Sequence, residues 1–495
     1  MLRVAVVGSG PAGLYTAEAL VKQAALLPSP VTIQVDVLDR LPTPYGLVRY
    51  GVAPDHKSIK SVANYLRRVL ESPGVTFVGG VHFGTDVTRE DLLHAYDAVV
   101  YATGAMRDRR LAIPGEDLPG SYAATDFVNW YCGHPDVDHG AFTLDAESAA
   151  VIGVGNVAVD VARILARDPD ELEHTDIPEP VMAALRASKV REVHVIGRRG
   201  PAQAKFTTKE LRELGDLPGV HVSAHPAEVD LTDGYDASGE SAALAASDRR
   251  VRGNLVAITG WCGETDGEVA VGEGRRLRLR FWLRPVEIQE SSAGTVAGLR
   301  LERTRLTDSG EFEGTGEFET LEAQLVLRSV GYQSVPLPGV PFDTRTHTVP
   351  NASGRVLAEA GQPLPGEYVA GWLKRGPTGV IGTNKADAAE TVQALLADLA
   401  GGPDVGEGKL PRPGLLPRPS QPGPESGEPS APGDAAARSP LAQVLADRGV
   451  APVSYADWLR ISAAEEDLAA SLGRGDRVKL PSKDAIWSTA HRDSR

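Results

Sequence analysis

The feature that most constrains this chain is a glycine-rich turn close to its start. Leu2–Val7 is a short apolar run with the branched residues typical of a strand, and it leads directly into Gly8, Gly10 and Gly13. This G-x-G-x-x-G spacing closes a tight turn between a strand and a helix, here predicted over Pro11–Gln23. The N–H groups and the positive dipole end of such a helix bind negatively charged groups. We therefore expect the turn to hold the pyrophosphate of a dinucleotide.

The residues around the turn support the same interpretation. Pro11 suits the first helical turn, where its missing N–H has no intrahelical partner to lose. A second strand, predicted over Val31–Leu38, ends at Asp39, whose carboxylate would accept a hydrogen bond from a ribose hydroxyl. Strand, glycines, helix, second strand and acid follow in that order. This order distinguishes a dinucleotide site from an ordinary tight turn.

A second turn of the same kind follows later in the chain. The strand-like run Ala149–Ile152 leads into Gly153-Val154-Gly155-Asn156-Val157-Ala158, and a helix is predicted over Val157–Ala166. The next strand, Glu192–Ile196, is followed by Arg198 and Arg199. Guanidinium groups bind a 2′-phosphate, which a carboxylate would repel. The second nucleotide is thus predicted to be NADP(H), unless the arginines are merely solvated, and the first is then most economically FAD.

The rest of the chain predicts further elements and two segments outside the nucleotide folds. Helices are predicted over Ser58–Glu71, Asp91–His94 and Asn384–Leu399, and strands over Val75–Val81, Ala98–Tyr101, Leu277–Leu283, Gly298–Leu306, Leu325–Val330 and Glu367–Ala370. Residues 220–327 are expected to alternate short strands with polar turns. Residues 403–439 are dense in Pro, Gly, Ser and charge, which is typical of a disordered linker. Residues 440–470 recover helical periodicity, so the tail is expected to dock through Tyr455 and Trp458.

Composition excludes several classes of protein. A net charge of −15 argues against general nucleic-acid binding, and no apolar run reaches the roughly 18 residues of a membrane span. The two cysteines, Cys132 and Cys262, form no C-x-x-C pair, which counts against thioredoxin reductase-like chemistry, and no metal site is expected. The chain enters its first strand without a signal-peptide pattern, so we expect a cytoplasmic location.

Four long motifs carry a resemblance to a known family. PYGLVRYGVAPDHK, VGNVAVDVAR, GRRGPAQAKFTTKELRE and GWLKRGPTGVIGTNK resemble the adrenodoxin reductase-like ferredoxin–NADP reductases. The resemblance implies an α/β protein with two Rossmann-like dinucleotide-binding domains, of the glutathione and adrenodoxin reductase type. The NADP domain, residues 108–330, would be inserted in an FAD domain made of residues 1–107 and 331–402. The linker 403–439 and a helical extension, 440–495, would follow.

The resemblance also implies the site residues. FAD would be contacted at Ala12, Asp39, Leu47, Trp372, Gly379, Val380 and Ile381, with Phe83 a less specific match. NADPH would be held by Val154, Gly155, Asn156, Val157, Arg198, Arg199, Glu210 and Gly379. His56 and Glu213 would pair and position the nicotinamide over the flavin, or would only fasten the two domains together. For Asp160, capping of a neighbouring backbone and a bridge between domains both remain open.

The expected activity is electron transfer from NADPH through FAD to a ferredoxin-type iron–sulfur protein. An NADPH diaphorase or quinone reductase that uses small acceptors, and a non-catalytic flavin-binding redox sensor, remain as alternatives. Two arginine clusters are expected to form a basic face for an acidic partner, namely Arg249, Arg250 and Arg252, and Arg275, Arg276, Arg278, Arg280 and Arg284. Because the implied flavin contacts all precede residue 403, FAD is expected to bind without the tail.

Overall fold

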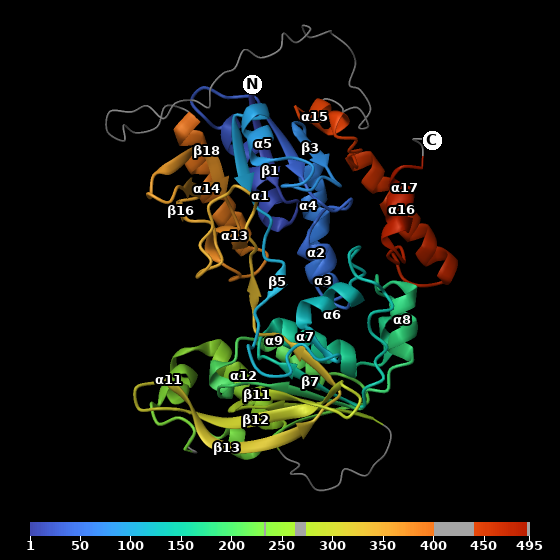
Figure 1. The fold of residues 1–495 in the computed structure, drawn as a ribbon, viewed down its shortest axis with the longest axis vertical. Coiled ribbons are helices and arrows are strands. Elements are labelled where there is room, and N and C mark those ends of the chain that lie inside the picture. The colour runs from blue at the N-terminus through green and yellow to red at the C-terminus, as the bar shows by residue number, and fades with distance from the viewer. Residues whose placement is uncertain (232–233, 263–273, 400–439, 493–495) are drawn as a thin grey trace. The chain divides into compact units, whose positions relative to one another are not determined.

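The computed structural model describes residues 1–231, 234–262, 274–399 and 440–492. The chain divides into two compact units (Figure 1): unit 1 combines Met1–Arg107 with Tyr332–Arg495, and unit 2 is Asp108–Gly331. The chain passes from one unit to the other at β5 (Arg107–Asp108) and immediately before β15 (Tyr332–Gln333). The predicted linker, 403–439, lies outside the described residues.

Unit 1 is built on a largely parallel sheet with strand order β16-β17-β18-β4-β1-β2-β3. Strand β1 lies between β2 and β4, with Val4 opposite both Val35 and Ala98. The antiparallel pairs are confined to β16, β17 and β18. The strands are β1 (Leu2–Val7), β2 (Ile33–Leu38), β3 (Val75–Val78), β4 (Ala98–Tyr101), β16 (Asn351–Ala352), β17 (Arg355–Leu357) and β18 (Pro363–Val369).

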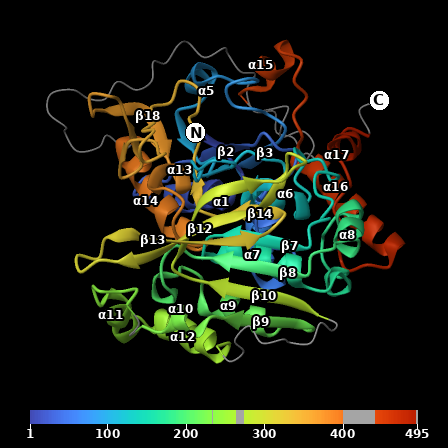
Figure 2. The same cartoon turned by 60° about the horizontal axis from the view of Figure 1, so that its bottom comes forward.

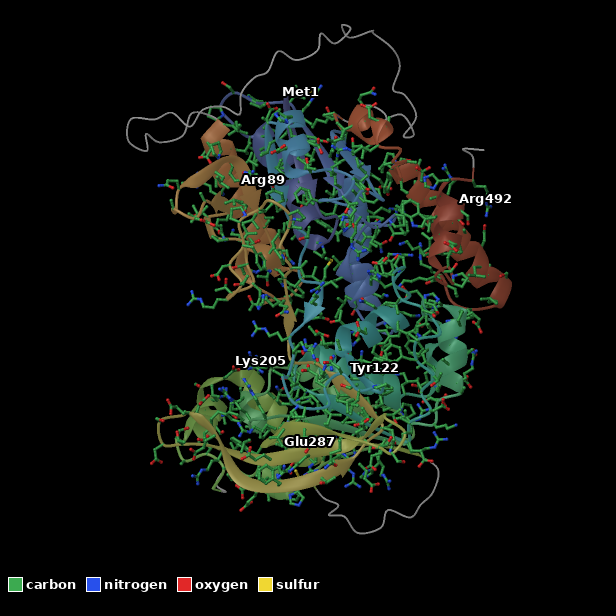
Figure 3. All side chains as sticks on the ribbon, viewed as in Figure 1. Met1, Arg89, Tyr122, Lys205, Glu287 and Arg492 are labelled. Carbon is green, nitrogen blue, oxygen red and sulfur yellow. The ribbon has the colours of Figure 1, made fainter. Side chains whose placement is uncertain are left out.

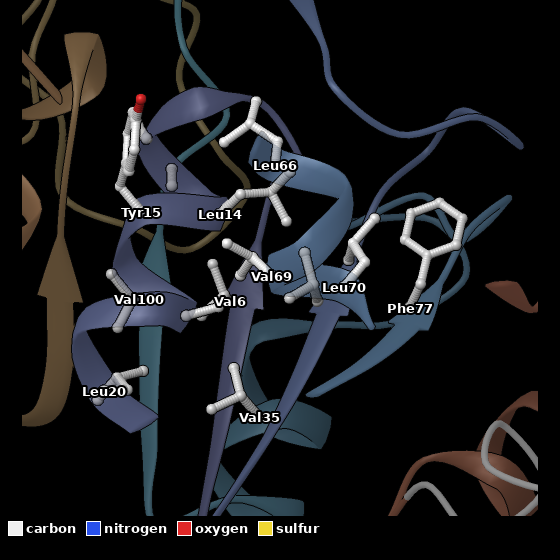
Figure 4. Packing of buried hydrophobic residues seen from close by; sticks show 14 of the residues in the cluster. Val6, Leu14, Tyr15, Leu20, Val35, Leu66, Val69, Leu70, Phe77 and Val100 are labelled. Atoms are coloured by element: carbon white, nitrogen blue, oxygen red, sulfur yellow. The ribbon is translucent and has the colours of Figure 1, made fainter. Parts of the chain in front are cut away.

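Both faces of this sheet are buried, as is typical of parallel sheets covered by helices. Val4 and Val6 pack into one apolar cluster and Ala5 and Val7 into the other, because successive side chains of a strand point to opposite faces. Figure 4 shows the first cluster, in which strand valines pack with Leu14 of the helix that follows the turn. The amino end of this helix is thereby fixed at the carboxyl end of β1.

The helices of unit 1 come from both ends of the chain. They are α1 (Pro11–Ala25), α2 (Leu47–Tyr50), α3 (Lys57–Lys60), α4 (Val62–Leu70), α5 (Arg89–Ala95), α13 (Trp372–Arg375), α14 (Thr383–Leu399), α15 (Ala442–Asp447), α16 (Tyr455–Leu472) and α17 (Lys483–Ala490). The single helix predicted over Ser58–Glu71 is wrong, since the chain breaks at Ser61 between α3 and α4. Ser61 donates its hydroxyl to the Ser58 carbonyl, a local bond that competes with helix continuation.

Unit 2 contains a parallel sheet in the order β6-β14-β7-β8-β10-β9 and a separate antiparallel sheet, β11-β12-β13. Figure 2 shows β7, β8, β10 and β9 lying side by side. The parallel strands are β6 (Ser121–Ala123), β7 (Ser148–Ile152), β8 (Glu192–Ile196), β9 (Val220–Ala224), β10 (Arg275–Arg280) and β14 (Leu325–Arg328). The antiparallel strands are β11 (Leu283–Glu290), β12 (Val296–Leu306) and β13 (Phe312–Glu322). Two sheets of parallel type with crossover helices confirm the expected α/β class.

The helices of unit 2 correct one expectation. They are α6 (Ala124–Tyr131), α7 (Asn156–Ala166), η1 (Pro169–Leu172), α8 (Glu179–Arg186), η2 (Pro201–Gln203), α9 (Thr208–Gly215), α10 (Pro226–Val229), α11 (Glu240–Ser247) and α12 (Arg249–Gly260). Residues 220–327 were expected to form only short strands and turns, yet α10, α11 and α12 lie among them. Helix α12 starts where the Asp248 carboxylate accepts the N–H groups of Arg250 and Val251. The strand predicted over Leu277–Leu283 is also displaced, since β10 ends at Arg280.

Three further features concern the whole described chain. Among the residues that the structure describes, no helix is both long and apolar enough to span a membrane. Within the same residues, no group of His, Cys, Asp and Glu side chains is arranged to hold a metal ion. Cys132 lies buried and Cys262 half-buried, without a disulfide between them.

Candidate active site

The first glycine turn has a backbone that only glycine fits at two places. Gly8 has φ +114°, and a Cβ there would lie 2.5 Å from the Ala102 carbonyl oxygen. A Cβ on Gly13 would lie 1.8 Å from the Gly8 carbonyl oxygen. Helix α1 begins after Gly10 with Pro11 in its first turn and without a side-chain cap. Its first N–H groups therefore point out of the helix end toward the place expected for a pyrophosphate.

Asp39 follows β2 and is held beside this turn. Its Oδ2 accepts the Ser9 N–H at 2.8 Å and the Ser9 hydroxyl at 2.5 Å, and its Oδ1 accepts the Leu41 N–H at 2.9 Å. Both carboxylate oxygens are thereby oriented. Each carboxylate oxygen offers about two acceptor positions, so the group fits a ribose hydroxyl as well as its protein donors.

A buried loop lies over the same turn. The Tyr45 N–H donates to the Ser9 carbonyl at 3.1 Å. Gly46 has φ +48°, and a Cβ there would lie 2.9 Å from the Gly10 Cα, so the two backbones lie in close contact. Leu47, a predicted FAD contact, begins α2 immediately afterwards and is half-exposed. His56 follows this loop and is the buried N-cap residue of α3.

The C-terminal part of unit 1 reaches the start of α1. Gly371 has φ +74°, and a Cβ there would lie 2.4 Å from the Ala12 Cβ. Trp372 follows at the start of α13 and donates its Nε1–H to the Thr378 carbonyl at 3.1 Å. The structure therefore places Gly371, the residue before Trp372, against Ala12, although the two segments are far apart in the sequence.

The stretch Gly379–Ile381 leads into α14, which begins at Thr383, one residue earlier than predicted. Gly379 has φ +84°, and Val380 is 66% exposed. The Thr383 hydroxyl oxygen accepts the Val380 N–H at 3.1 Å, which shapes the turn before the helix. The stretch is accessible at the positive end of a helix, as the flavin hypothesis requires.

The Phe83 side chain lies in the core of unit 1, and its contact with FAD stays a prediction. Its ring packs edge-on against Tyr101, with centroids 5.7 Å apart, in the apolar cluster on the opposite face of the sheet from Ala12. Tyr101 in turn donates to the buried Glu367 carboxylate, which also binds Arg89, labelled in Figure 3. Burial and the Glu367 carboxylate raise the pKa of Tyr101. The Phe83 ring is thus occupied with core packing.

The second glycine turn is more open. Gly153 has φ +137°, and a Cβ there would lie 2.1 Å from the Ser329 carbonyl oxygen. A Cβ on Gly155, by contrast, would meet no atom of the described residues within 4 Å. The third position of the pattern is Ala158, which is buried in α7. The backbone of Gly155 is therefore accessible to a phosphate at the start of α7.

Side chains of α7 and the following loops brace this turn. The Val154 carbonyl accepts the Lys205 N–H, and the Asn156 Oδ1 accepts the Thr207 N–H, both at 2.8 Å; Figure 3 labels Lys205. Thr207 is the N-cap of α9, and its hydroxyl donates to the Glu210 Oε2 at 3.0 Å. Asn156 and Glu210, both predicted NADPH contacts, are thus linked through Thr207.

Arg198 and Arg199 lie beyond the carboxyl end of β8, the position that Asp39 has beside β2. Arg198 is exposed, and its guanidinium carbon lies 5.4 Å from the centre of the Phe312 ring. The Arg198 carbonyl accepts the Thr304 hydroxyl at 2.8 Å. The Nε of Arg199 is buried and has no hydrogen-bond partner among the described residues. A buried, unpartnered guanidinium donor fits an anionic ligand such as a 2′-phosphate.

Glu213 lies on α9 and is partly exposed, with its Oε2 3.7 Å from Nη1 of Arg163. Arg163 is fully buried and donates to the Asp160 Oδ1 at 2.8 Å. Asp160 thus forms an ion pair within α7. His56 belongs to unit 1 and Glu213 to unit 2, so each has a defined place within its own unit.

The arginines of β10 and β11, expected to form a basic docking face, also make contacts within unit 2. Several of them form ion pairs: Arg276 and Arg278 share Glu192, Arg280 contacts Glu228 and Glu319, and Arg284 contacts Glu302. Arg275 donates instead to the carbonyls of Leu165 and Arg167. The group near residue 250 lies on α12, where Arg250 and Arg252 donate to nearby backbone carbonyls. These ion pairs and local bonds reduce the free positive charge of the two clusters, and a basic face for an acidic partner stays a prediction.

Comparison with known proteins gives a consistent result. Residues 2–214 match the model of the pyridine nucleotide-disulphide oxidoreductase family. The chain is 44% identical over 483 residues to the NADPH-ferredoxin reductase FprA of Mycobacterium tuberculosis, covering 97% of each chain. It is 41% identical to the mitochondrial NADPH:adrenodoxin oxidoreductase of Bos taurus, covering 99% of this chain and 92% of that one. The solved structure of M. tuberculosis FprA in complex with NADPH superposes with a TM-score of 0.83 at 40% identity, covering 99% of each chain.

The chain belongs to the adrenodoxin reductase-like ferredoxin–NADP reductase family. The family resemblance stated from the motifs is therefore confirmed. The oxidoreductase match at residues 2–214 spans both glycine turns and also Arg198, Arg199 and Glu210. Because the alignment to the Bos taurus enzyme covers 99% of this chain, it includes the C-terminal helices α15–α17 as well.

Proposed function

We propose that this protein is an FAD-dependent ferredoxin–NADP(+) reductase that passes electrons from NADPH through FAD to a ferredoxin-type iron–sulfur protein. The observation that carries the proposal is the contrast between the two strand ends, Asp39 beside one glycine turn and Arg198 with Arg199 beside the other. A carboxylate suits an unphosphorylated ribose, and paired guanidiniums suit a 2′-phosphate. Relatives named for NADPH, ferredoxin and adrenodoxin support the same assignment.

Residues of unit 1 would hold FAD. The N–H groups at the start of α1 would face the pyrophosphate, and Asp39 would accept from the ribose. The proposed contacts also include Ala12, Leu47, Phe83, Trp372, Gly379, Val380 and Ile381. Bound FAD supplies the step that accepts electrons as a pair and releases them singly. Trp372 follows Gly371, which lies against Ala12, and its indole is proposed to cover the cofactor.

Residues of unit 2 would hold NADPH. The turn Val154–Val157 would bind the pyrophosphate at the start of α7, and Arg198 with Arg199 would bind the 2′-phosphate. Glu210 would orient this site through Thr207, and Gly379 of unit 1 is included by the family pattern. Each charge-assisted hydrogen bond to the phosphate contributes about 1.5–3 kcal/mol.

His56 and Glu213 are proposed to position the nicotinamide for transfer, since hydride transfer itself needs no proton relay. Arg163 supports the Glu213 carboxylate from within unit 2. The competing role is a fastening between the two units. Replacing Glu213 with Gln distinguishes them: a positioning role lowers kcat with FAD content unchanged, whereas a fastening role leaves kcat near that of the native enzyme.

The test of the proposal starts from the purified protein and its chromophore. We expect about one noncovalently bound FAD per chain and NADPH-driven reduction of a ferredoxin with a higher kcat/KM than dichlorophenolindophenol or a quinone. Efficient turnover of only the small acceptors would instead indicate a diaphorase or quinone reductase. FAD bound without any turnover would indicate a redox sensor, and failure to bind FAD would contradict the proposal as a whole.

A cytoplasmic location is also proposed, because the two cysteines are not joined in a disulfide in the described chain. Fractionation of the source cells with an antibody against the protein checks this. Recovery from a membrane or an extracellular fraction would contradict it.

A further inference from the structure

A buried ion pair joins the C-terminal helices to the loop that lies over the first glycine turn. Arg49, in α2 of that loop, donates from Nη2 to Oε1 of Glu465 in α16 at 2.5 Å. The side chains of Arg49 and Glu465 are 6% and 0% exposed, and the residues are 416 positions apart in the sequence. Figure 1 shows α16 and α17, in red, beside the blue elements of the N-terminal segment. The tail is therefore part of the interior of unit 1.

The tail holds both the side chain and the backbone of Arg49. Lys479, which is almost fully buried, donates from Nζ to the Arg49 carbonyl at 2.8 Å. Glu465 is itself held by Arg477, whose Nη1 donates to Oε2 at 2.9 Å, and by the Leu480 N–H at 3.4 Å. Both residues of the ion pair are thus fixed by further hydrogen bonds, and moving either one would break several of them.

Aromatic and backbone contacts continue the same attachment. The Arg49 guanidinium lies over the Trp458 ring, 4.9 Å from its centre, and Tyr45 packs edge-on against that ring at 5.9 Å. Val453 and Gly79 exchange two backbone hydrogen bonds of 2.8 Å, which join the tail to the end of β3. Trp458 thus contacts residues on both sides of Gly46, the position where the loop meets the glycine turn.

A buried pair of this kind makes loop and tail interdependent. Burial alone would lower the pKa of Arg49, but the Glu465 carboxylate and Tyr50 raise it above its ordinary value, so the guanidinium remains charged. Removing one member of a buried pair leaves an uncompensated charge, which is strongly destabilising. The buried pair with α16 therefore adds to the bonds from Ser9, Asp39 and Gly80 that hold the loop over residues 41–50.

We propose that the C-terminal segment 453–490 is a latch for FAD, and that Glu465 is a positioning residue that holds the loop over residues 41–50 in its FAD-binding form. This inference rests on the proposed function, in which the first glycine turn binds FAD. The connection runs from Glu465 through Arg49 to Leu47 and Gly46, and from Gly46 to Gly10 of the turn. Since binding free energies are reciprocal, bound FAD also stabilises the docked tail. This proposal and the expectation that FAD binds without the tail predict opposite effects on FAD affinity when the tail is undocked.

The test compares two adjacent glutamates in the full-length protein. Glu465→Gln weakens the buried pair, whereas the control Glu466→Gln changes a half-exposed carboxylate that also contacts Arg477. We measure the FAD dissociation constant of each apoprotein by flavin fluorescence, and the unfolding midpoint with and without FAD. Glu465→Gln is expected to raise the FAD dissociation constant at least about tenfold. This change corresponds to only part of the free energy lost when a buried ion pair is broken. Glu466→Gln is expected to leave it unchanged.

The outcomes separate a latch from a merely structural contact. If the segment is a latch, Glu465→Gln weakens FAD binding. FAD then raises the unfolding midpoint of this variant by less than it raises that of the native protein. Equal lowering of both midpoints with native FAD affinity would overturn the latch and leave the proposed function intact. Failure of the native protein to bind FAD would overturn the proposed function itself. If Glu465→Gln does not fold, Lys479→Met removes the bond to the Arg49 carbonyl, and unchanged FAD affinity in that variant equally rejects the latch.

Discussion

The two glycine turns share a spacing but differ in how the protein encloses them. Gly10 of the first turn lies against the backbone of Gly46, beneath a loop that the tail holds in place. Gly155 of the second turn has no described atom within 4 Å of the position of a Cβ. The acid at the first strand end is fixed by bonds from Ser9 and Leu41, whereas Arg198 at the second is exposed. The first turn suits a cofactor that stays bound, and the second suits a nucleotide that must enter and leave.

The largest effect is expected from removing both guanidiniums of the open site. The double substitution Arg198→Ala and Arg199→Ala should cost about 3–6 kcal/mol of transition-state binding. This corresponds to a fall in kcat/KM for NADPH on the order of 10²–10⁴-fold, and the exposure of Arg198 favours the lower end. NADH has no 2′-phosphate, so its kinetics should barely change. Steady-state kinetics with both nucleotides check this, with the exposed Arg305→Ala as a control. Equal loss with both nucleotides would mean that the arginines are structural and would remove the chemical contrast between the sites.

A smaller effect is expected from a matched pair of glycine substitutions, which tests whether the first turn is more tightly enclosed than the second. Gly46→Ala places a methyl group 2.9 Å from the Gly10 Cα and forces alanine to φ +48°, a strain of about 1–3 kcal/mol. FAD affinity should fall by roughly 5- to 150-fold in a fluorescence titration. Gly155→Ala meets no described protein atom, so FAD affinity should stay native while the KM for NADPH rises. The comparison fails if both substitutions weaken FAD binding alike.

The smallest effect concerns the orientation of Arg198. The Phe312 ring lies against the guanidiniums of both Arg198 and Arg284, and an exposed contact of this type contributes about 0.5–1 kcal/mol. Phe312→Leu should therefore lower kcat/KM for NADPH by about 2- to 5-fold without affecting NADH. Phe312→Tyr keeps an aromatic face and should retain native kinetics. Loss of activity with both nucleotides in the leucine variant would assign Phe312 to packing of β13 instead.

What the sequence predicted well depends on local rules. Both turns, their strands and the start of each helix follow from glycine spacing next to a buried apolar run, and the positions of Asp39 and Arg198 follow from where a strand ends. These features need no knowledge of distant residues. Helix α12 was not predicted, although Asp248 marks its start as a capping residue. The arginine-rich run that follows Asp248 was interpreted as a strand.

What the sequence did not predict depends on partners from elsewhere in the chain. The arginines of β10 predicted a basic face, but the local charge pattern could not show their ion-pair partners, since Glu192 comes from the neighbouring strand and Glu228 from a separate helix. The tail was expected to dock, yet nothing in its periodicity indicated that Glu465 would meet Arg49. Phe83 likewise faces the core cluster with Tyr101, which only the packing of the sheet reveals.

The long separation between Arg49 and Glu465 has a consequence for biosynthesis. Chains grow at about 5–20 residues per second, so the 416 positions between the two residues correspond to roughly 20–80 s of synthesis. During that interval the first strands of unit 1 exist without their C-terminal strand β18 and without α16, whereas unit 2 is continuous in sequence and is completed earlier. The nascent chain therefore assembles the inserted unit first. The N-terminal segment, with Arg49 still exposed to solvent, can complete its packing only after the C-terminal helices have been synthesised.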